Sequence, residues 1–227
     1  MTSIGFRLFD PLTDKPEILP DAAGVYLIVL RPTATLPIMT KNLEMPLMSD
    51  FSFNGEVYKV IYAGKSSKSL HARDYAQHFN GTAGRSTLRK SIGCLMGYKL
   101  IPRDANAPLN GKTTFNVEDE NNLTEWMVNN LLLFYSVTND FTNLEKELIK
   151  EYNPPLNLQG NFYKVNFNFR KKLSLLRKYS TDLSTSYRHE HDIRDGLDNV
   201  PIYSYCPLCG EVLWDNKPYC FICGWKA

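Results

Sequence analysis

The chain has no run of residues that is long and apolar enough to cross a bilayer. Residues 1–21 also lack the basic lead and apolar core of a secretory signal. The formal net charge is only +2, so any argument for a nucleic-acid partner must rest on local clusters. We therefore expect a cytoplasmic protein with no membrane partner. Its 43% hydrophobic and 22% charged residues indicate a folded globular chain.

Cysteine is rare over most of the chain. Only Cys94 lies outside the C-terminal segment, and its small neighbours in a helical pattern predict a buried thiol, not a nucleophile. The other four follow a C-x2-C-x10-C-x2-C pattern and are Cys206, Cys209, Cys220 and Cys223. Two C-x2-C pairs at this spacing can place four thiolates around one structural Zn²⁺. A metal is also needed for folding, since a tail of about 25 residues cannot fold on apolar burial alone. The expected zinc ribbon would contact DNA or a protein partner.

Two apolar segments predict strands in the first third of the chain. Residues 24–30 are apolar on both faces of an extended chain, which is typical of a buried strand. Asn54 and Gly55 predict a hairpin turn that leads into a second strand over about residues 56–63. Several prolines predict an irregular loop over residues 32–50.

Apolar residues at helical spacing predict several helices after residue 66. Ser86 is a candidate N-cap for one of these helices. A loop over residues 101–120 contains a possible short strand around 113–117. The predicted helices cover residues 67–79, a segment after Ser86 that reaches Leu100, and residues 122–135, 142–152 and 169–179.

Three short motifs occur in order: GVY at residues 24–26, YAG at 62–64 and LEKELIKEYNPPLN at 144–157. Between the second and the third, KSSKSLHARDYAQHF supplies a helix with an arginine followed by a histidine. Together these motifs resemble the GIY-YIG nuclease family over about residues 20–160. The resemblance implies an α+β fold, with a small antiparallel sheet flanked by helices. It also implies divalent-metal-dependent hydrolysis of DNA phosphodiester bonds.

The resemblance implies a set of site residues. They are the two motif tyrosines, a position that is often polar or basic, the helix arginine, a following histidine, a metal-binding glutamate and a supporting asparagine. In that order they are Tyr26, Tyr62, Lys65, Arg73, His78, Glu145 and Asn157. His78 follows Arg73 by five residues, where the family usually has four, so the two would not share a face of an ideal α-helix.

The chemistry of phosphodiester hydrolysis fits these residue types. A lone carboxylate such as Glu145 suits one Mg²⁺ or Mn²⁺, whose other ligands are water and phosphate oxygens. Arg73 would hold a non-bridging phosphate oxygen. A cation such as Lys65 or Arg73 would favour the phenolate of a nearby tyrosine, which would then act as a base or position water. Which tyrosine takes this role stays open.

Each residue also has an ordinary structural interpretation. Tyr26 and Tyr62 fit aromatic residues of a sheet core. Thr142 and Glu145 match a capping box, in which the glutamate only closes a helix N-terminus. Asn157 follows two prolines and fits a turn. The order of the motifs along the chain favours the nuclease.

Two basic clusters are candidates for phosphate contacts, and an ordinary solvated face explains either of them as well. The first contains Arg85, Arg89 and Lys90, and the second contains Arg170, Lys171, Lys172, Arg177 and Lys178.

The sequence therefore predicts a GIY-YIG-like nuclease domain over residues 1–160, a basic helical connector over 161–200 and a zinc ribbon over 201–227. The predicted activity is hydrolysis of DNA with Mg²⁺ or Mn²⁺ at Glu145, and the zinc ribbon would aid binding of DNA or of a protein. One alternative is a non-catalytic DNA-binding module on the same scaffold. Another is a zinc-ribbon protein whose large domain only presents an interaction surface. The pathway, the substrate's structure and the oligomeric state do not follow from the sequence.

Overall fold

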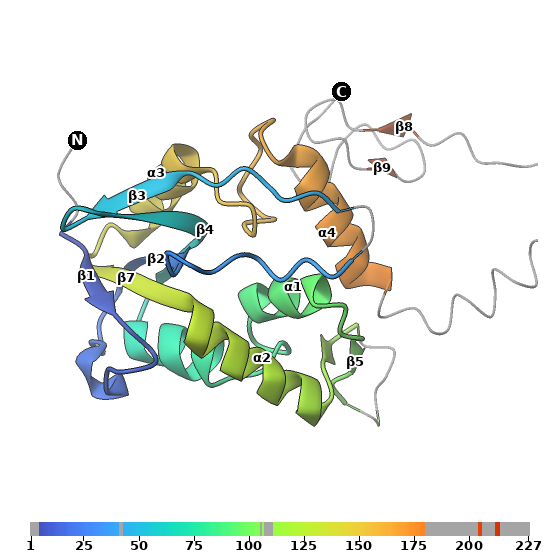
Figure 1. Ribbon diagram of the computed structural model, residues 1–227, viewed down its shortest axis with the longest axis horizontal. Helices are drawn as coiled ribbons and strands as arrows, with labels where there is room; N and C mark the ends of the chain where they lie inside the picture. Colours follow the sequence, from blue (N-terminus) through green and yellow to red (C-terminus); the bar gives the residue numbers. More distant parts are fainter. Residues whose placement is uncertain are drawn as a thin grey trace, which may run out of the picture.

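The computed structural model describes residues 5–40, 43–104, 106, 111–179, 204–205 and 212–213. Its centre is an antiparallel sheet in the order β1-β7-β2-β4-β3 (Figure 1). In that order the strands are Arg7–Phe9, Leu131–Val137, Gly24–Leu30, Glu56–Ser66 and Asp50–Phe53. Asn54 and Gly55 join β3 to β4 with positive φ angles of 50° and 83°, as the predicted hairpin requires.

Strand β2 is the middle of the sheet, and all seven of its residues are buried. Its alternating side chains enter two different apolar clusters, one on each face of the sheet. Val25, Leu27 and Val29 face α3 (Phe141–Tyr152), which covers one side. Both apolar faces of the predicted strand are therefore used.

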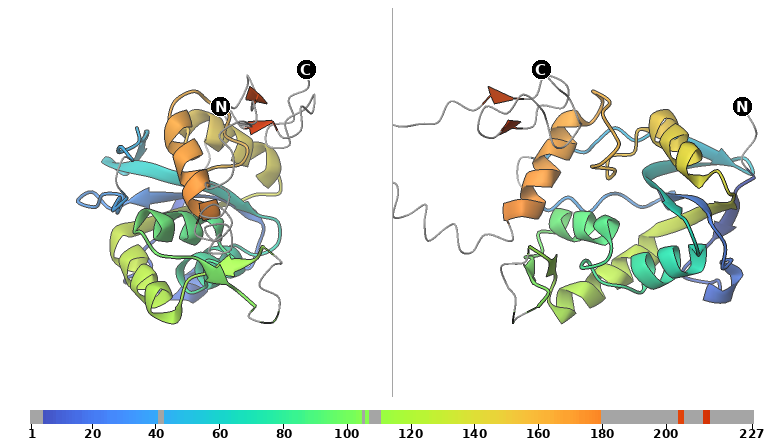
Figure 2. Two further views of the ribbon diagram at one scale, coloured as in Figure 1. Left: turned by 90° about the vertical axis from the view of Figure 1, so that its right-hand side faces the viewer. Right: turned by 180° about the vertical axis from the view of Figure 1, so that it is seen from behind.

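The other face of the sheet carries several helices (Figures 1 and 2). They are the π-helix η2 (His71–Phe79), α1 (Thr87–Leu95) and α2 (Val117–Asn130). Helix α4 (Phe167–Tyr179) packs against α1 beyond the end of the sheet. Smaller elements are the 3-10 helix η1 (Pro16–Ile18) and the strand pairs β5 (Ile101–Pro102) with β6 (Thr113–Thr114) and β8 (Ser204–Tyr205) with β9 (Val212–Leu213).

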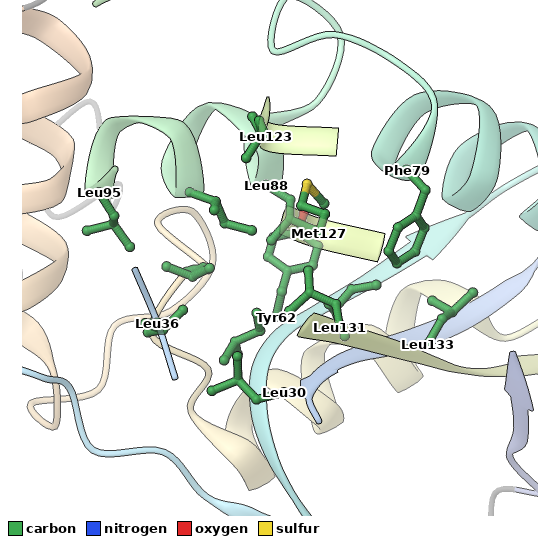
Figure 3. Close-up of a cluster of buried hydrophobic side chains, with 14 of the residues drawn as sticks. Leu30, Leu36, Tyr62, Phe79, Leu88, Leu95, Leu123, Met127, Leu131 and Leu133 are labelled. Carbon is green, nitrogen blue, oxygen red and sulfur yellow. The ribbon is translucent and has the colours of Figure 1, made fainter. Parts of the chain in front are cut away.

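The larger core lies between the sheet and these helices (Figure 3). Leu88 and Leu95 of α1 meet Leu123 and Met127 of α2 there, and Tyr62 of β4 lies among them. Leu173 and Phe169 of α4 belong to the same cluster. These helices and one face of the sheet thus share one apolar cluster.

The predicted helix over residues 122–135 is wrong in its second half. Helix α2 ends at Asn130, and the backbone turns to extended geometry at Leu131. The following residues form β7, which lies between β1 and β2. A short fully apolar run is compatible with a helix or a buried strand, and here pairing with both neighbours decides for the strand.

Two arginines that were predicted on basic surfaces are buried instead. Arg89 is 0% exposed and forms an ion pair with Glu120 at 2.9 Å. Arg170 is 5% exposed, and its Nη1 donates to the carbonyl oxygen of Val165 at 2.9 Å. Neither residue is available for a phosphate contact or forms a solvated face.

The four cysteines of the predicted zinc ribbon lie outside the described residues. The buried thiol predicted at Cys94 is confirmed, with 4% exposure. Among the described residues, we find no helix whose length and apolarity would let it span a membrane.

Candidate active site

Tyr26 and Tyr62 lie beside each other on neighbouring strands. Tyr26 is opposite Gly64, while Tyr62 is opposite Ile28. The two phenol rings stack with centroids 6.2 Å apart and an interplanar angle of 29°. A Cβ on residue 64 would lie 2.4 Å from Cζ and Oη of Tyr26. The glycine of the YAG motif therefore makes room for the tyrosine of the GVY motif.

His78 joins the two tyrosines from η2. Its Nε2 lies 2.7 Å from Oη of Tyr26, and its ring centroid is 5.9 Å from that of Tyr62. Its Nδ1 lies 2.7 Å from Oγ of Ser86, the N-cap of α1, which also accepts the backbone N–H of Arg89. Both ring nitrogens of a fully buried imidazole are thus bonded, so the ring orientation is fixed.

The π-helical geometry of η2 accounts for the spacing between Arg73 and His78. The backbone N–H of Asn80 donates to the carbonyl oxygen of Tyr75 at 2.7 Å, which is a five-residue step. In such a turn, residues five apart lie closer to one face than they do in an α-helix. The mismatch expected on an ideal α-helix therefore does not apply to this segment.

Arg73 of the same helix interacts with both tyrosines. Its guanidinium interacts electrostatically with the phenols of Tyr26 and Tyr62, and it donates to Oε1 of Gln77 at 2.8 Å. The next residue, Asp74, is 0% exposed, and neither of its carboxyl oxygens has a hydrogen-bond partner among the described residues. The site therefore combines a part-exposed cation with a buried carboxyl group.

Burial keeps the central tyrosine and histidine neutral. It is the largest cause that raises the pKa of Tyr26 well above its ordinary value, and the nearby Arg73 lowers that pKa by less. Burial also lowers the pKa of His78 well below its ordinary value, and Arg73 adds to this shift. At neutral pH, Tyr26 is therefore a phenol bonded to a neutral imidazole. The predicted lowering of a tyrosine pKa by a cation is therefore outweighed by burial at Tyr26.

Lys65 and Glu145 form an ion pair on the other side of β4. Nζ of Lys65 lies 2.9 Å from Oε2 of Glu145, and the two side chains are 34% and 22% exposed. Helix α3 has Asp140 as its N-cap, so Thr142 lies inside the helix. The capping-box interpretation of Glu145 is therefore wrong, and its carboxylate points to a cation instead.

Asn157 holds the strand that carries Tyr62. Its Nδ2 donates to the carbonyl oxygen of Ala63 at 2.7 Å, and the N–H of Ala63 donates to its Oδ1 at 2.8 Å. The N–H of Leu156 donates to the carbonyl oxygen of Ile61 at 3.1 Å. The segment after the two prolines thus bonds the edge of β4 beyond its pairing with β3, and it does more than shape a turn.

Six of the seven predicted site residues fall into two groups, while Asn157 bonds the backbone of β4. Tyr26, Tyr62, Arg73 and His78 form the tyrosine–histidine group on the face of the sheet that η2 covers, while Lys65 and Glu145 lie on the face that α3 covers. Among the described residues, no hydrogen bond or ion pair joins one group to the other. Along β4, Tyr62 and Lys65 are separated by roughly 10 Å. The pocket of about 250 Å³ beside residues 43–47 contains no side chain of either group.

Sequence reasoning did not place Ser86, Gly64 or Asp74 in the site. The capping pattern identified Ser86 only as a helix cap, and Gly64 was part of a motif without a stated role. The local sequence offers no signal for Asp74, because its burial depends on the tertiary packing of η2 against the sheet.

The fold and the site define a class of protein: α+β, with paired tyrosines on central antiparallel strands and a helix that adds an arginine and a histidine. The family model for the GIY-YIG catalytic domain matches residues 24–179, which is more than two thirds of the chain. The chain therefore belongs to the GIY-YIG family, as the three motifs predicted. Proteins of this family are generally nucleases. Searches of curated proteins and of solved structures gave no significant match.

Proposed function

We propose that the protein is an endonuclease that hydrolyses DNA phosphodiester bonds with the help of Mg²⁺ or Mn²⁺. The main support is the tyrosine–histidine group, in which one network fixes Tyr26, His78 and Ser86 beside an arginine. Such fixed polar groups stabilise a charged transition state without reorganisation. The roles of the individual residues are part of this proposal.

The residues present fit a hard divalent cation at Glu145. Its carboxylate is part-exposed and supplies the oxygen ligand that Mg²⁺ prefers, while water and phosphate oxygens complete the coordination. A metal bound there would neutralise charge on the phosphate and activate water. Lys65 neutralises the carboxylate until substrate binds, and its ammonium group then pairs with a phosphate oxygen.

The tyrosine–histidine group orients the substrate and manages protons. Arg73 presents a planar donor to a non-bridging phosphate oxygen. Tyr62 is 9% exposed while Tyr26 is 0% exposed, so Tyr62 is the tyrosine that reaches substrate or water. Tyr26 and His78 lie behind it, and their hydrogen bond holds the proton of the buried pair at Oη or Nε2.

The first test is nicking of a supercoiled plasmid with Mg²⁺ or Mn²⁺. Glu145→Gln removes the charged ligand, and we expect a loss of roughly 100-fold or more, the size found when one transition-state group is removed. Glu147→Gln is the matched control, since Glu147 is exposed on the same helix. Equal cleavage by wild type and Glu145→Gln would rule out the assignment of Glu145.

The separation of the two groups favours a second candidate function. Lys65 forms an ion pair with the carboxylate of Glu145, and the tyrosines lie on the opposite face of the sheet. A chain that binds DNA without cutting it fits this arrangement. Tight DNA binding with no cleavage in either metal would support this candidate.

The C-terminal cysteines complete the proposal. Cys206, Cys209, Cys220 and Cys223 would hold one structural Zn²⁺ in a ribbon that aids binding of DNA or of a partner. Zinc content of the purified protein, compared with a Cys206→Ser variant, measures this directly. The cytoplasmic location stays a prediction from the sequence.

A further inference from the structure

His78 is the middle member of a buried chain of hydrogen bonds from Ser86 to Tyr26. Nδ1 of His78 lies 2.7 Å from Oγ of Ser86, and Nε2 lies 2.7 Å from Oη of Tyr26. Ser86 is 1% exposed, and the other two residues are 0% exposed. Because burial holds the pKa of His78 well below its ordinary value, the ring is neutral and carries a single N–H. The partners of the two ring nitrogens decide which nitrogen carries it.

The hydroxyl group of Ser86 needs an acceptor for its own proton. Its Oγ already accepts the backbone N–H of Arg89 at 3.1 Å, and a backbone N–H can only donate. Among the described residues, the acceptor within hydrogen-bond distance of this hydroxyl is Nδ1 of His78. If Nδ1 carried the N–H, Oγ would receive two donors, and the hydroxyl proton would be buried without a partner, which is unfavourable. Ser86 therefore donates to Nδ1.

The N-terminus of α1 favours the same direction of hydrogen bonding. Ser86 is the N-cap of this nine-residue helix, so Nδ1 of His78 lies within hydrogen-bond distance of the cap oxygen. The first backbone N–H groups of a helix give this end a partial positive charge. That charge attracts a lone pair on Nδ1 and repels an N–H there. The cap and the hydroxyl proton of Ser86 thus both indicate that Nε2 carries the imidazole proton.

Arg89 holds the backbone of His78 independently of the Ser86 side chain. Its Nη1 donates to the carbonyl oxygen of His78 at 3.1 Å and to that of Phe79 at 3.2 Å. Its Nη2 in turn lies 2.9 Å from Oε2 of Glu120, and both side chains of this ion pair are buried. We therefore expect the imidazole to stay between Tyr26 and residue 86 when only the side chain of residue 86 is changed.

We propose that Ser86 is a positioning residue that fixes His78 as the Nε2–H tautomer, so that the imidazole donates to Oη of Tyr26. His78 then stabilises negative charge on the phenol oxygen and cannot take the phenol proton at Nε2, which is already protonated. The proton of Tyr26 is left for an acceptor on the substrate side, where Tyr62 stacks on Tyr26 and is 9% exposed. This inference deepens the proposed nuclease function and rests on it.

The first test is a long-range ¹H–¹⁵N NMR spectrum of the histidine side chains, in which the two neutral tautomers give different patterns. The chain has four histidines, and the signals of His78 are those that disappear in His78→Gln. We expect wild type to show a protonated Nε2 and an unprotonated Nδ1. Ser86→Asp keeps a capping oxygen but offers only acceptors, so it should move the proton to Nδ1. A wild type with the proton on Nδ1 would overturn the inference.

Plasmid cleavage tests whether the tautomer matters for the reaction. We expect Ser86→Asp to lower kcat by roughly 100-fold at unchanged KM, the low end of what a proton-handling group contributes. Ser86→Thr keeps the hydroxyl and the cap, so it should restore both the tautomer and most of the activity. Asn116→Asp adds the same charge at the exposed N-cap of α2 and is the matched control.

The two measurements separate this inference from the proposed function. A reversed tautomer in Ser86→Asp together with wild-type kcat would show that Ser86 has no positioning role in the reaction. An equal loss of kcat in Ser86→Thr and Ser86→Asp would also contradict the role of the hydroxyl proton. No cleavage by wild type in either metal would overturn the proposed function, while the NMR spectrum would still decide the tautomer.

Discussion

Asp74 is a buried carboxyl group with no hydrogen-bond partner among the described residues. Burial raises its pKa well above the ordinary value, and Arg73 lowers it by less. The folded protein therefore keeps the proton at pH values where the unfolded chain has lost it. Since the native state then binds more protons, the free energy of unfolding falls as pH rises above about 4.

Asp74→Asn removes this pH dependence. Between pH 4.5 and 7, the variant should gain stability relative to wild type by up to about 1.4 kcal/mol per pH unit. Urea unfolding at several pH values measures the difference, which also cancels the opposite contribution of His78, common to both proteins. Asp21→Asn, at an exposed position, is the control. A constant difference between Asp74→Asn and wild type would mean that Asp74 is ionised in the folded protein.

Single residues show where sequence reasoning succeeds. Ser86 was identified as a helix cap because capping depends on a few neighbours in the chain. Its bond to His78 depends on how η2 meets α1, which no local pattern contains. Arg89 reads as a surface cation for the same reason, because only the fold brings Glu120 to it.

At the scale of the element, β4 determines how the site is built. The strand carries Tyr62 toward one face and Ala63 toward the other, and it leaves Gly64 bare under the ring of Tyr26. The β2 and β4 strands were predictable from apolar pattern and turn chemistry. Strand β7 was not, because an apolar run of this length also suits a helix until its neighbours are known.

Gly64→Ala tests the packing of β4 against Tyr26. The new Cβ would lie 2.4 Å from Oη and Cζ, so the ring must leave its bond to His78. We expect about 1–3 kcal/mol of lost stability, as for other overpacked cores. Plasmid cleavage should fall further than the stability loss explains, because the network is disturbed.

A double substitution identifies the contact that Gly64→Ala disturbs. Tyr26→Phe removes the oxygen that the new methyl group meets. The double variant should therefore lose less stability than the sum of the losses in the two single variants. Gly5→Ala is the control, because a Cβ at Gly5 meets no atom within 4 Å. Full cleavage by Gly64→Ala would show that Tyr26 can move without loss of function.

At the scale of the whole molecule, α4 belongs to the same apolar cluster as α1 and α2. Phe169 and Leu173 are 6% and 0% exposed and join the cluster that contains Tyr62 and Leu156. The family match also extends to residue 179. The predicted domain boundary at residue 160 rested on a change in composition. Composition shows the charge of the segment that follows, but not that Phe169 and Leu173 within it are buried. The boundary stays a prediction, and truncation tests it.

A chain of residues 1–179 should fold, whereas a chain of residues 1–160 should be strongly destabilised. Removing two large buried side chains costs about 3–6 kcal/mol, a large share of the 5–15 kcal/mol that stabilises a typical domain. Urea unfolding measures both chains. Within 1–179, Leu173→Ala should lower stability by about 2–5 kcal/mol. Leu175→Ala, at a residue that is 43% exposed, should change it by about 0.5 kcal/mol or less. Equal urea midpoints for the two chains would place α4 outside the cooperative core.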